Sequence, residues 1–215
     1  MRGPGSADPG LPDEFRTLAG PGESEIKIQR SRFLGFAAPA PDEAVARELL
    51  ADLARRYHDA RHLCSAWRLG RPPSVQEVRN DAGEPAGTAG EPILAALRRV
   101  EVSEAACVVI RYFGGIKLGT GGLARAYGEA AAAALAAAGT RTILLGRRFV
   151  LRFPYPQQKT VSHLLVRHGG RVEQEEFAAE VRWVVWLPHS SWRGFASALT
   201  EATAAAVTAE PIPDP

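Results

Sequence analysis

The 215-residue sequence has little of what marks secreted, membrane-spanning or zinc-binding proteins. It holds only two cysteines, Cys64 and Cys107, which are too few for a disulfide framework and suit a reducing compartment. No apolar run reaches the roughly 18 residues of a membrane-spanning helix, and the first thirty residues lack a secretory-signal pattern. No second Cys or His pair accompanies His62 and Cys64 at zinc-ligand spacing. We therefore expect a soluble, cytoplasmic protein without metal, cofactor or membrane partner.

The familiar nucleotide-binding motifs are also missing. A Walker motif requires lysine where Thr120 follows Gly119, so a standard P-loop is excluded. Gly119, Gly121 and Ala124 fit the spacing of a dinucleotide fingerprint, but no acidic residue lies about 20 positions further on and no βαβ repeat surrounds them. No Ser-His-Asp arrangement with a nucleophile elbow is present either.

The charge that is present is uneven along the chain. Residues 1–54 hold six Lys or Arg against nine Asp or Glu, whereas residues 55–125 hold eleven against seven. The positive excess therefore surrounds a glycine-rich segment, and the net charge of +2 conceals it. Of the 26 basic residues only three are lysine, which makes Lys117 in that segment notable.

The pattern of apolar residues predicts an α+β protein of two domains after a flexible tail over residues 1–14, with order beginning near Ser24. In the first domain, residues 15–145, we expect strands at 25–29, 32–38, 62–70 and 105–113 and helices at 41–57, 91–99 and 123–138. The strand at 105–113 is apolar without alternation, which predicts a central position. The alanine-rich helix at 123–138 can lie close against a sheet, and Gly139 ends it.

Residues 146–215 predict a second, ferredoxin-like domain. Strands at 148–155, 171–177 and 179–188, helices at 157–168 and 190–204, and a short final strand give the order β-α-β-β-α-β. Trp186 and Trp192 are expected to form an exposed aromatic area, with core or interdomain packing as the default and RNA stacking as the alternative.

The segment RYFGGIKLGTGGLAR, residues 111–125, carries the candidate site. Five of the nine residues from Gly114 to Gly122 are glycine, which exposes backbone N–H groups next to a helix start. A phosphate or another anion is the functional interpretation, and a tight turn is the structural one. The candidate anion-binding or nucleic-acid-binding residues are Arg111, Gly114, Gly115, Lys117, Gly119, Thr120, Gly121, Gly122 and Arg125.

A second segment, NDAGEPAGTAGEP, contributes possible supporting residues. Asp81, Glu84, Thr88 and Glu91 could bind a cation or activate a water, and a carboxylate could fix Lys117. The structural alternative is that Thr88 or Gly90 begins a helix and Glu91 complements its dipole, which is favoured for Glu91. His62 and Cys64 share one face of a strand, where a buried thiol is favoured over a catalytic pair. The supporting set is His62, Arg68, Asp81, Glu84 and Thr88, with no catalytic residue assigned.

These motifs together resemble the IMPACT family, in particular its two-domain bacterial branch. The resemblance rests on SRFLGFAAP (31–39), HLCSAW (62–67), NDAGEPAGTAGEPIL (80–94) and VIRYFGGIKLGTGGLARAY (109–127), and it covers the chain from about Phe15 onward. The family loop usually reads Ser-Asp-Asp-Gly-Glu-Pro. Ala82 replaces its second aspartate here, which weakens any role of this loop in metal binding.

The resemblance implies a first domain with the left-handed β-α-β fold of a small-subunit ribosomal protein and GHMP kinases. It also implies a second domain similar to the last domain of elongation factor G. Eukaryotic relatives act in translational control, which predicts a non-enzymatic regulator that holds RNA or ribosomal phosphate at the glycine loop. Two alternatives stay open: an enzyme acting on a phosphorylated small molecule or nucleotide, and a protein-protein competitor in translational control.

Overall fold

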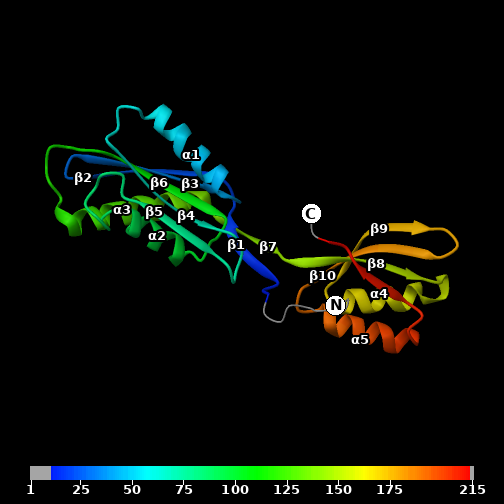
Figure 1. The fold of residues 1–215 in the computed structure, drawn as a ribbon. Helices are drawn as coiled ribbons and strands as arrows, with labels where there is room; N and C mark the ends of the chain where they lie inside the picture. The colour runs from blue at the N-terminus through cyan, green and yellow to red at the C-terminus, as the bar shows by residue number, and fades with distance from the viewer. Residues whose placement is uncertain (1–10, 214–215) are drawn as a thin grey trace, which may run out of the picture. The chain divides into compact units, whose positions relative to one another are not determined.

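The computed structural model describes residues 11–213 and divides the chain into two compact units. The first unit is residues 15–143, and the second joins the segment ending at Glu14 to the segment from Leu144 onward. Figure 1 shows both as mixed α/β units. Residues 1–10 of the expected flexible tail lie outside the described residues, but Asp13 accepts hydrogen bonds from the backbone and hydroxyl of Ser190, and Glu14 begins a strand.

The first unit is built on a five-stranded antiparallel sheet with the order β2-β3-β6-β4-β5. Its strands are β2 (Gly22–Ile28), β3 (Ser31–Pro39), β4 (His62–Leu69), β5 (Gln76–Asn80) and β6 (Ala105–Tyr112). Its helices are α1 (Glu43–Arg56), α2 (Gly90–Arg99) and α3 (Gly119–Ala138). Because β6 is the middle strand and is buried along nearly its whole length, its unbroken apolar sequence is explained.

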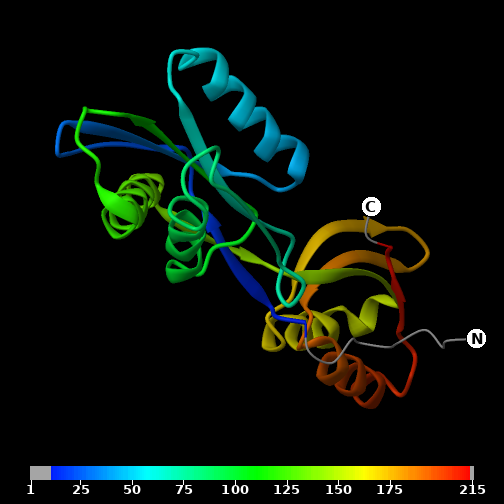
Figure 2. The ribbon, with the colours of Figure 1, turned by 60° about the vertical axis from the view of Figure 1, so that its left-hand side comes forward.

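The two faces of this sheet carry separate helices. Cys107 and Val109 pack with α2 and α3, whereas Val108 and Ile110 pack against Leu53 of α1. Figure 2 shows α1 on the opposite side of the sheet from α2 and α3. A strand whose successive side chains point to opposite faces must be apolar throughout when both faces are covered.

The alanine-rich face of α3 brings the helix unusually close to the sheet. A Cβ at Gly22 would come within 2.2 Å of Ala138 N, and one at Gly35 would come within 2.6 Å of Ala130 O. Gly139 ends the helix at a φ of +63°. The expected close packing is therefore present, but the helix begins at Gly119 and not at Leu123.

Three strands are missing from the sequence-based prediction. β1 (Glu14–Leu18) pairs with β7 (Thr140–Leu144) in a two-stranded sheet, and β5 lies at the edge of the large sheet. Order beginning near Ser24 is therefore wrong, since Phe15 and Leu18 are buried. All five residues of β5 are exposed, so that strand has no apolar alternation to reveal it.

The second unit contains β8 (Gly146–Phe153), α4 (Gln158–Arg167), β9 (Arg171–Phe177), β10 (Val181–Pro188), α5 (Trp192–Thr203) and β11 (Thr208–Pro211), with a short 3-10 turn, η1 (Tyr155–Gln157), before α4. The sheet order is β11-β8-β10-β9. Its core lies between the sheet and the two helices and includes Phe149, Leu151, Trp183 and Phe195.

The expected exposed aromatic area at Trp186 and Trp192 is not present. Trp186 is buried under the guanidinium of Arg171, 4.1 Å from the ring centroid, and Trp192 stacks on Phe149 with a centroid separation of 3.6 Å. The exposed aromatic rings of the described second unit are Tyr155 and Phe177. Arginine pairing and core packing therefore cover both tryptophans.

Candidate functional site

The glycine-rich loop runs from the end of β6 into the start of α3, as predicted. Leu118 occupies the N-cap position of α3, no side chain caps the helix, and its first turn contains no acidic residue. The N–H groups of a first helical turn have no partner within the helix and carry a partial positive charge. Gly119, Thr120 and Gly121, which begin the helix, are exposed residues.

The glycines of the loop differ in why the fold requires them. A Cβ at Gly114 would lie 2.1 Å from the backbone of Arg30, and Gly115 and Gly119 have φ values of +87° and +70°. These three positions are explained by close approach or by left-handed backbone. Gly121 has no positive φ, and a Cβ at this position would meet nothing within 4 Å, so neither space nor backbone conformation explains the glycine.

Two of the predicted cations stand free beside this helix start. Lys117 and Arg125 are exposed, and within residues 11–213 neither makes an ion pair or side-chain hydrogen bond. Thr120 is also exposed, in the first turn of α3. The loop further exposes two apolar side chains, Phe113 at 56% and Ile116 at 42%.

Arg111 differs from those cations because it is buried and paired. Its side chain is 7% exposed, and Nη1 donates to Glu84 Oε1 at 2.7 Å. The guanidinium lies over the rings of Phe33 and Phe113, at 5.7 and 5.3 Å from their centroids. Its Nε has no partner in the described structure. Arg111 therefore joins the glycine loop to the loop between β5 and α2, residues 81–89, called the acidic loop below. Its charge is largely compensated by Glu84.

Glu84 is the centre of this buried cluster. Its side chain is 4% exposed, and Oε1 accepts a second hydrogen bond from the hydroxyl of Tyr127 on α3 at 2.8 Å. Burial raises the pKa of Tyr127 far above its ordinary value, and the neighbouring thiol Cys64 and Glu84 add to the effect. Tyr127 therefore stays protonated and acts as a donor.

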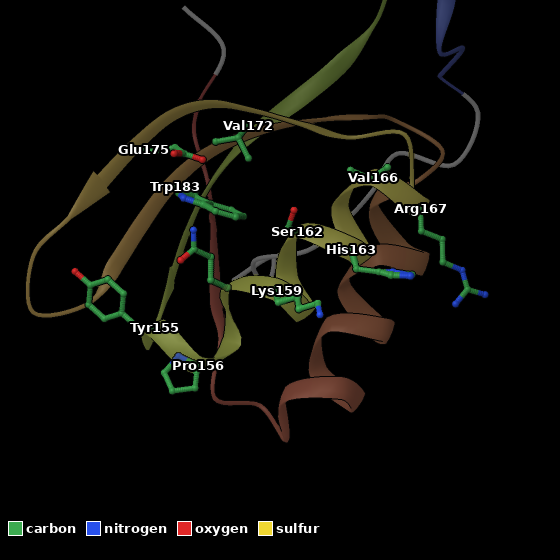
Figure 3. Close-up of a pocket in the computed structure, with 11 residues that line it drawn as sticks. Tyr155, Pro156, Lys159, Ser162, His163, Val166, Arg167, Val172, Glu175 and Trp183 are labelled. Atoms are coloured by element: carbon green, nitrogen blue, oxygen red, sulfur yellow. The ribbon is translucent and has the colours of Figure 1, made fainter.

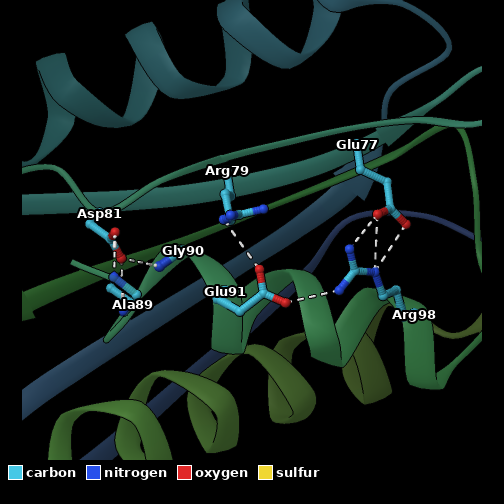
Figure 4. A network of polar contacts seen from close by, with 8 residues as sticks. Glu77, Arg79, Asp81, Ala89, Gly90, Glu91 and Arg98 are labelled. Atoms are coloured by element: carbon cyan, nitrogen blue, oxygen red, sulfur yellow. Dashed lines mark hydrogen bonds and ion pairs between the residues drawn. The ribbon is translucent and has the colours of Figure 1, made fainter. Parts of the chain in front are cut away.

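Asp81 organises the rest of the acidic loop. Its carboxylate accepts hydrogen bonds from the backbone N–H groups of Gly87, Ala89 and Gly90, so it caps α2 from nine residues before the helix (Figure 4). Burial acts to raise the pKa of Asp81, but these three donors outweigh it and hold the pKa below its usual value. The Thr88 hydroxyl donates to Pro85 O and does not cap the helix.

Two residues of β4 hold the backbone of the same loop. Nδ1 of His62 donates to Ala82 O at 2.9 Å, and the Cys64 thiol donates to Asp81 O at 2.9 Å. Burial raises the pKa of Cys64 to about 12, so this thiol is not a nucleophile at neutral pH. In these contacts His62 and Cys64 hold the backbone of the loop, which is a structural role.

The remaining candidates belong to a separate ion-pair network. Arg68 pairs with Glu77 and donates to Val102 O, while Glu91 bridges Arg79 and Arg98 (Figure 4). In the described part of the chain no group of three or more His, Cys, Asp or Glu side chains is arranged to hold a metal ion.

Sequence reasoning missed Tyr127, Ser31 and Phe113. Ser31 Oγ accepts the N–H of Gly114 at 3.2 Å, which fixes the start of the loop against β3. Tyr127 could have been placed on the buried face of α3, one turn after Leu123, but its partner Glu84 is 43 residues away in sequence.

Comparisons with known proteins match both parts of the chain. The Impact N-terminal domain model matches residues 29–135, and a domain of unknown function, DUF1949, matches residues 151–206. The IMPACT family member YigZ of Escherichia coli is 36% identical over 176 residues, covering 81% of this chain and 86% of its own length. YvyE of Bacillus subtilis is 32% identical over 88% of this chain and 87% of its own.

A further relative and a solved structure extend the agreement. An IMPACT family member of Haemophilus influenzae is 35% identical over 82% of this chain and 86% of its own length. A crystal structure described as that of a hypothetical protein is 32% identical and superposes with a TM-score of 0.64, covering 95% of this chain and all of its own. No helix within residues 11–213 is long and apolar enough to cross a membrane.

Proposed function

The chain belongs to the IMPACT family, and we propose that it is a non-enzymatic, translation-related regulator. Its glycine-rich loop holds phosphate groups of RNA, on the ribosome or on tRNA. The link to translation follows from the family's eukaryotic members. The choice of a phosphate follows from the loop itself, whose exposed amides, partial positive helix end and free cations all favour an anion.

One observation carries the proposal, namely that Gly121 stands in the uncapped first turn of α3 with open space around it. A glycine costs a helix up to about 1 kcal/mol relative to alanine. Where no steric or conformational reason is present, the approach of a ligand to the bare amide supplies one. The same reasoning does not apply to Gly114 or Gly119, which the fold itself requires.

The surroundings fit an RNA strand better than a small anion. Lys117 and Arg125 supply charge without a competing carboxylate, and Thr120 supplies a hydroxyl donor. Phe113 presents a ring that is 56% exposed at the start of the loop. Base stacking on such a ring contributes about 1–3 kcal/mol and tolerates any sequence.

Arg111 supports this surface from behind. Its ion pair with Glu84 fixes the acidic loop to β6, and its guanidinium packs against Phe113. We assign a positioning role to five residues, because their polar atoms form hydrogen bonds within the protein: Arg111, Glu84, Asp81, His62 and Thr88.

The test compares RNA retention of the full chain and of Lys117→Ala/Arg125→Ala over a range of salt concentrations. Each lost phosphate contact should lower the slope of log affinity against log salt by about 0.7–0.9. Lys27→Ala is the matched control, because Lys27 is an exposed lysine of the same unit with only a loose ion pair at 3.9 Å. An unchanged slope in the double variant would refute the proposal.

A second candidate function is competition for a protein partner, and the exposed Phe113 and Ile116 favour it. In that case Phe113→Ala should abolish partner capture while the salt dependence of RNA retention stays that of wild type. The enzyme alternative has less support, because Asp81 and Glu84, the candidate bases, are both committed to hydrogen bonds within the fold.

We also propose a fold for each of the two units. The order β11-β8-β10-β9 with two helices on one face supports a ferredoxin-like second unit, similar to the last domain of elongation factor G. The family resemblance supports the left-handed β-α-β fold for the first unit.

A further inference from the structure

A separate hollow lies in the second unit, between α4 and the hairpin of β9 and β10. It is an open hollow of about 900 Å³, within the range of small-molecule sites. Figure 3 shows Lys159 and His163 along α4 and Glu175, Val172 and Trp183 on the strands across from them. Tyr155 and Pro156 close one end.

The hollow exists because β9 is the edge strand of its sheet. Glu175 lies opposite Trp183 in the β9–β10 register, so both side chains project from the helix-facing side. Trp183 is covered, at 2% exposure, whereas Glu175 and Phe177 on the edge strand are exposed. The helices therefore leave the inner side of β9 open to a ligand.

Unpaired polar and charged side chains gather on the walls of this hollow. Lys159, His163 and Arg167 follow one another at four-residue intervals, about 6 Å apart along α4. Within residues 11–213 these three side chains, and Glu175 opposite them, make no ion pair or side-chain hydrogen bond.

The other face of the same sheet is different, because its arginines are paired. Arg152 pairs with Glu210, Arg182 with Glu176, and Arg171 with Glu173. The unpaired charges therefore lie on the helix-facing side of the sheet, and this is the face that a charged ligand could contact.

The wall of the hollow also contains an unsatisfied donor. The indole Nε1–H of Trp183 has no hydrogen-bond partner in the described structure, although the side chain is almost fully buried. That nitrogen is itself covered by protein, so Trp183 contributes an apolar wall to the hollow.

We propose that this hollow binds a purine nucleoside phosphate, with guanine as the matching base. Lys159, His163 and Arg167 hold the phosphate. The carboxylate of Glu175 accepts from the two adjacent N–H groups of a guanine edge, and Tyr155 and Pro156 pack against the planar ring. One cationic wall and one acidic wall suit a ligand with an anionic end and a donor-bearing end, and they disfavour a purely anionic one. The site does not depend on the glycine loop.

The experiment is calorimetric titration of the full chain with GMP, guanosine and inorganic phosphate. GMP should bind one to one, guanosine at least about 100-fold more weakly because it lacks both phosphate contacts, and inorganic phosphate at least about tenfold more weakly because it lacks the Glu175 contact, since each charged hydrogen bond corresponds to about a factor of ten. Lys159→Ala/Arg167→Ala should weaken GMP about 100-fold and leave guanosine unchanged. Glu175→Gln should weaken GMP and guanosine about tenfold and leave phosphate unchanged.

Two variants serve as controls. Arg182→Gln removes a cation from the opposite face of the same sheet, and Lys117→Ala removes the lysine of the glycine loop. Both should bind GMP as wild type does. Absence of GMP binding at millimolar concentration, binding that survives all substitutions in the hollow, or loss of binding in Lys117→Ala would overturn the proposal. Binding of a single-stranded RNA oligonucleotide at the hollow without GMP binding would overturn it in favour of a strand.

Discussion

Replacing Gly121 with alanine should move stability and RNA binding in opposite directions. A Cβ at this position meets nothing within 4 Å and the backbone φ is not positive, so the folded state accepts alanine without strain. Alanine restricts the unfolded chain and favours the helix, and the expected gain in unfolding free energy is about 0.5–1 kcal/mol. With a urea m-value of about 2 kcal/mol/M, the midpoint should rise by roughly 0.3–0.5 M.

The same methyl group should obstruct a phosphate that approaches the first turn of α3. Loss of one charge-assisted hydrogen bond from a backbone N–H corresponds to about 1.5–3 kcal/mol, which is a decrease in RNA affinity of about tenfold or more. Gly128→Ala is the matched control, because Gly128 lies on the same helix and its Cβ would make an ordinary contact of 3.8 Å with Pro92. It should gain similar stability and retain full RNA binding.

Urea unfolding followed by circular dichroism and filter retention of RNA at fixed salt measure the two quantities. If Gly121→Ala is stabilised but binds RNA as well as Gly128→Ala does, the bare amide is not a ligand contact. If Gly121→Ala is destabilised, the space described around Gly121 is wrong.

Two further predictions concern the buried cluster. Glu84→Gln should lower the unfolding free energy by about 3–5 kcal/mol, because the charge of Arg111 is left uncompensated. The double variant Glu84→Gln/Arg111→Met should lose less stability than the single variant, and equal losses in urea unfolding would contradict this. Asp81→Asn should cost about 1–2 kcal/mol at pH 7. Because the folded-state pKa of Asp81 is lowered, this stabilisation is present above about pH 4 and is lost as the pH falls through the folded-state pKa, so the difference from wild type in urea unfolding should narrow in acid.

Sequence patterns predicted the parts of the fold that are set by local burial. β6 is apolar at nearly every position because both its faces are covered, and α3 is alanine-rich because it lies against Gly22 and Gly35. Both features are visible within a short window of sequence. β5 was missed for the opposite reason, since an exposed edge strand has no apolar period.

The candidate site was predicted less completely because its partners are distant in sequence. The glycine loop was recognised from composition, but the start of α3 was expected one turn late, since three glycines mask a helix start. Arg111 was named as an anion-binding candidate without a partner in the protein. Its charge is compensated by Glu84, 27 residues earlier, and such a pair depends on strand order, which no local pattern records.

The position of β6 has a consequence for the order of events during synthesis. β6 lies between β3 and β4, and both earlier strands hydrogen-bond to it along their length. At about 5–20 residues per second, the ribosome needs roughly 4–15 seconds to proceed from Pro39 to Tyr112. During that interval β3 and β4 are made but lack their common neighbour, so the nascent chain carries two unpaired strand edges that are open to incorrect pairing until β6 is made.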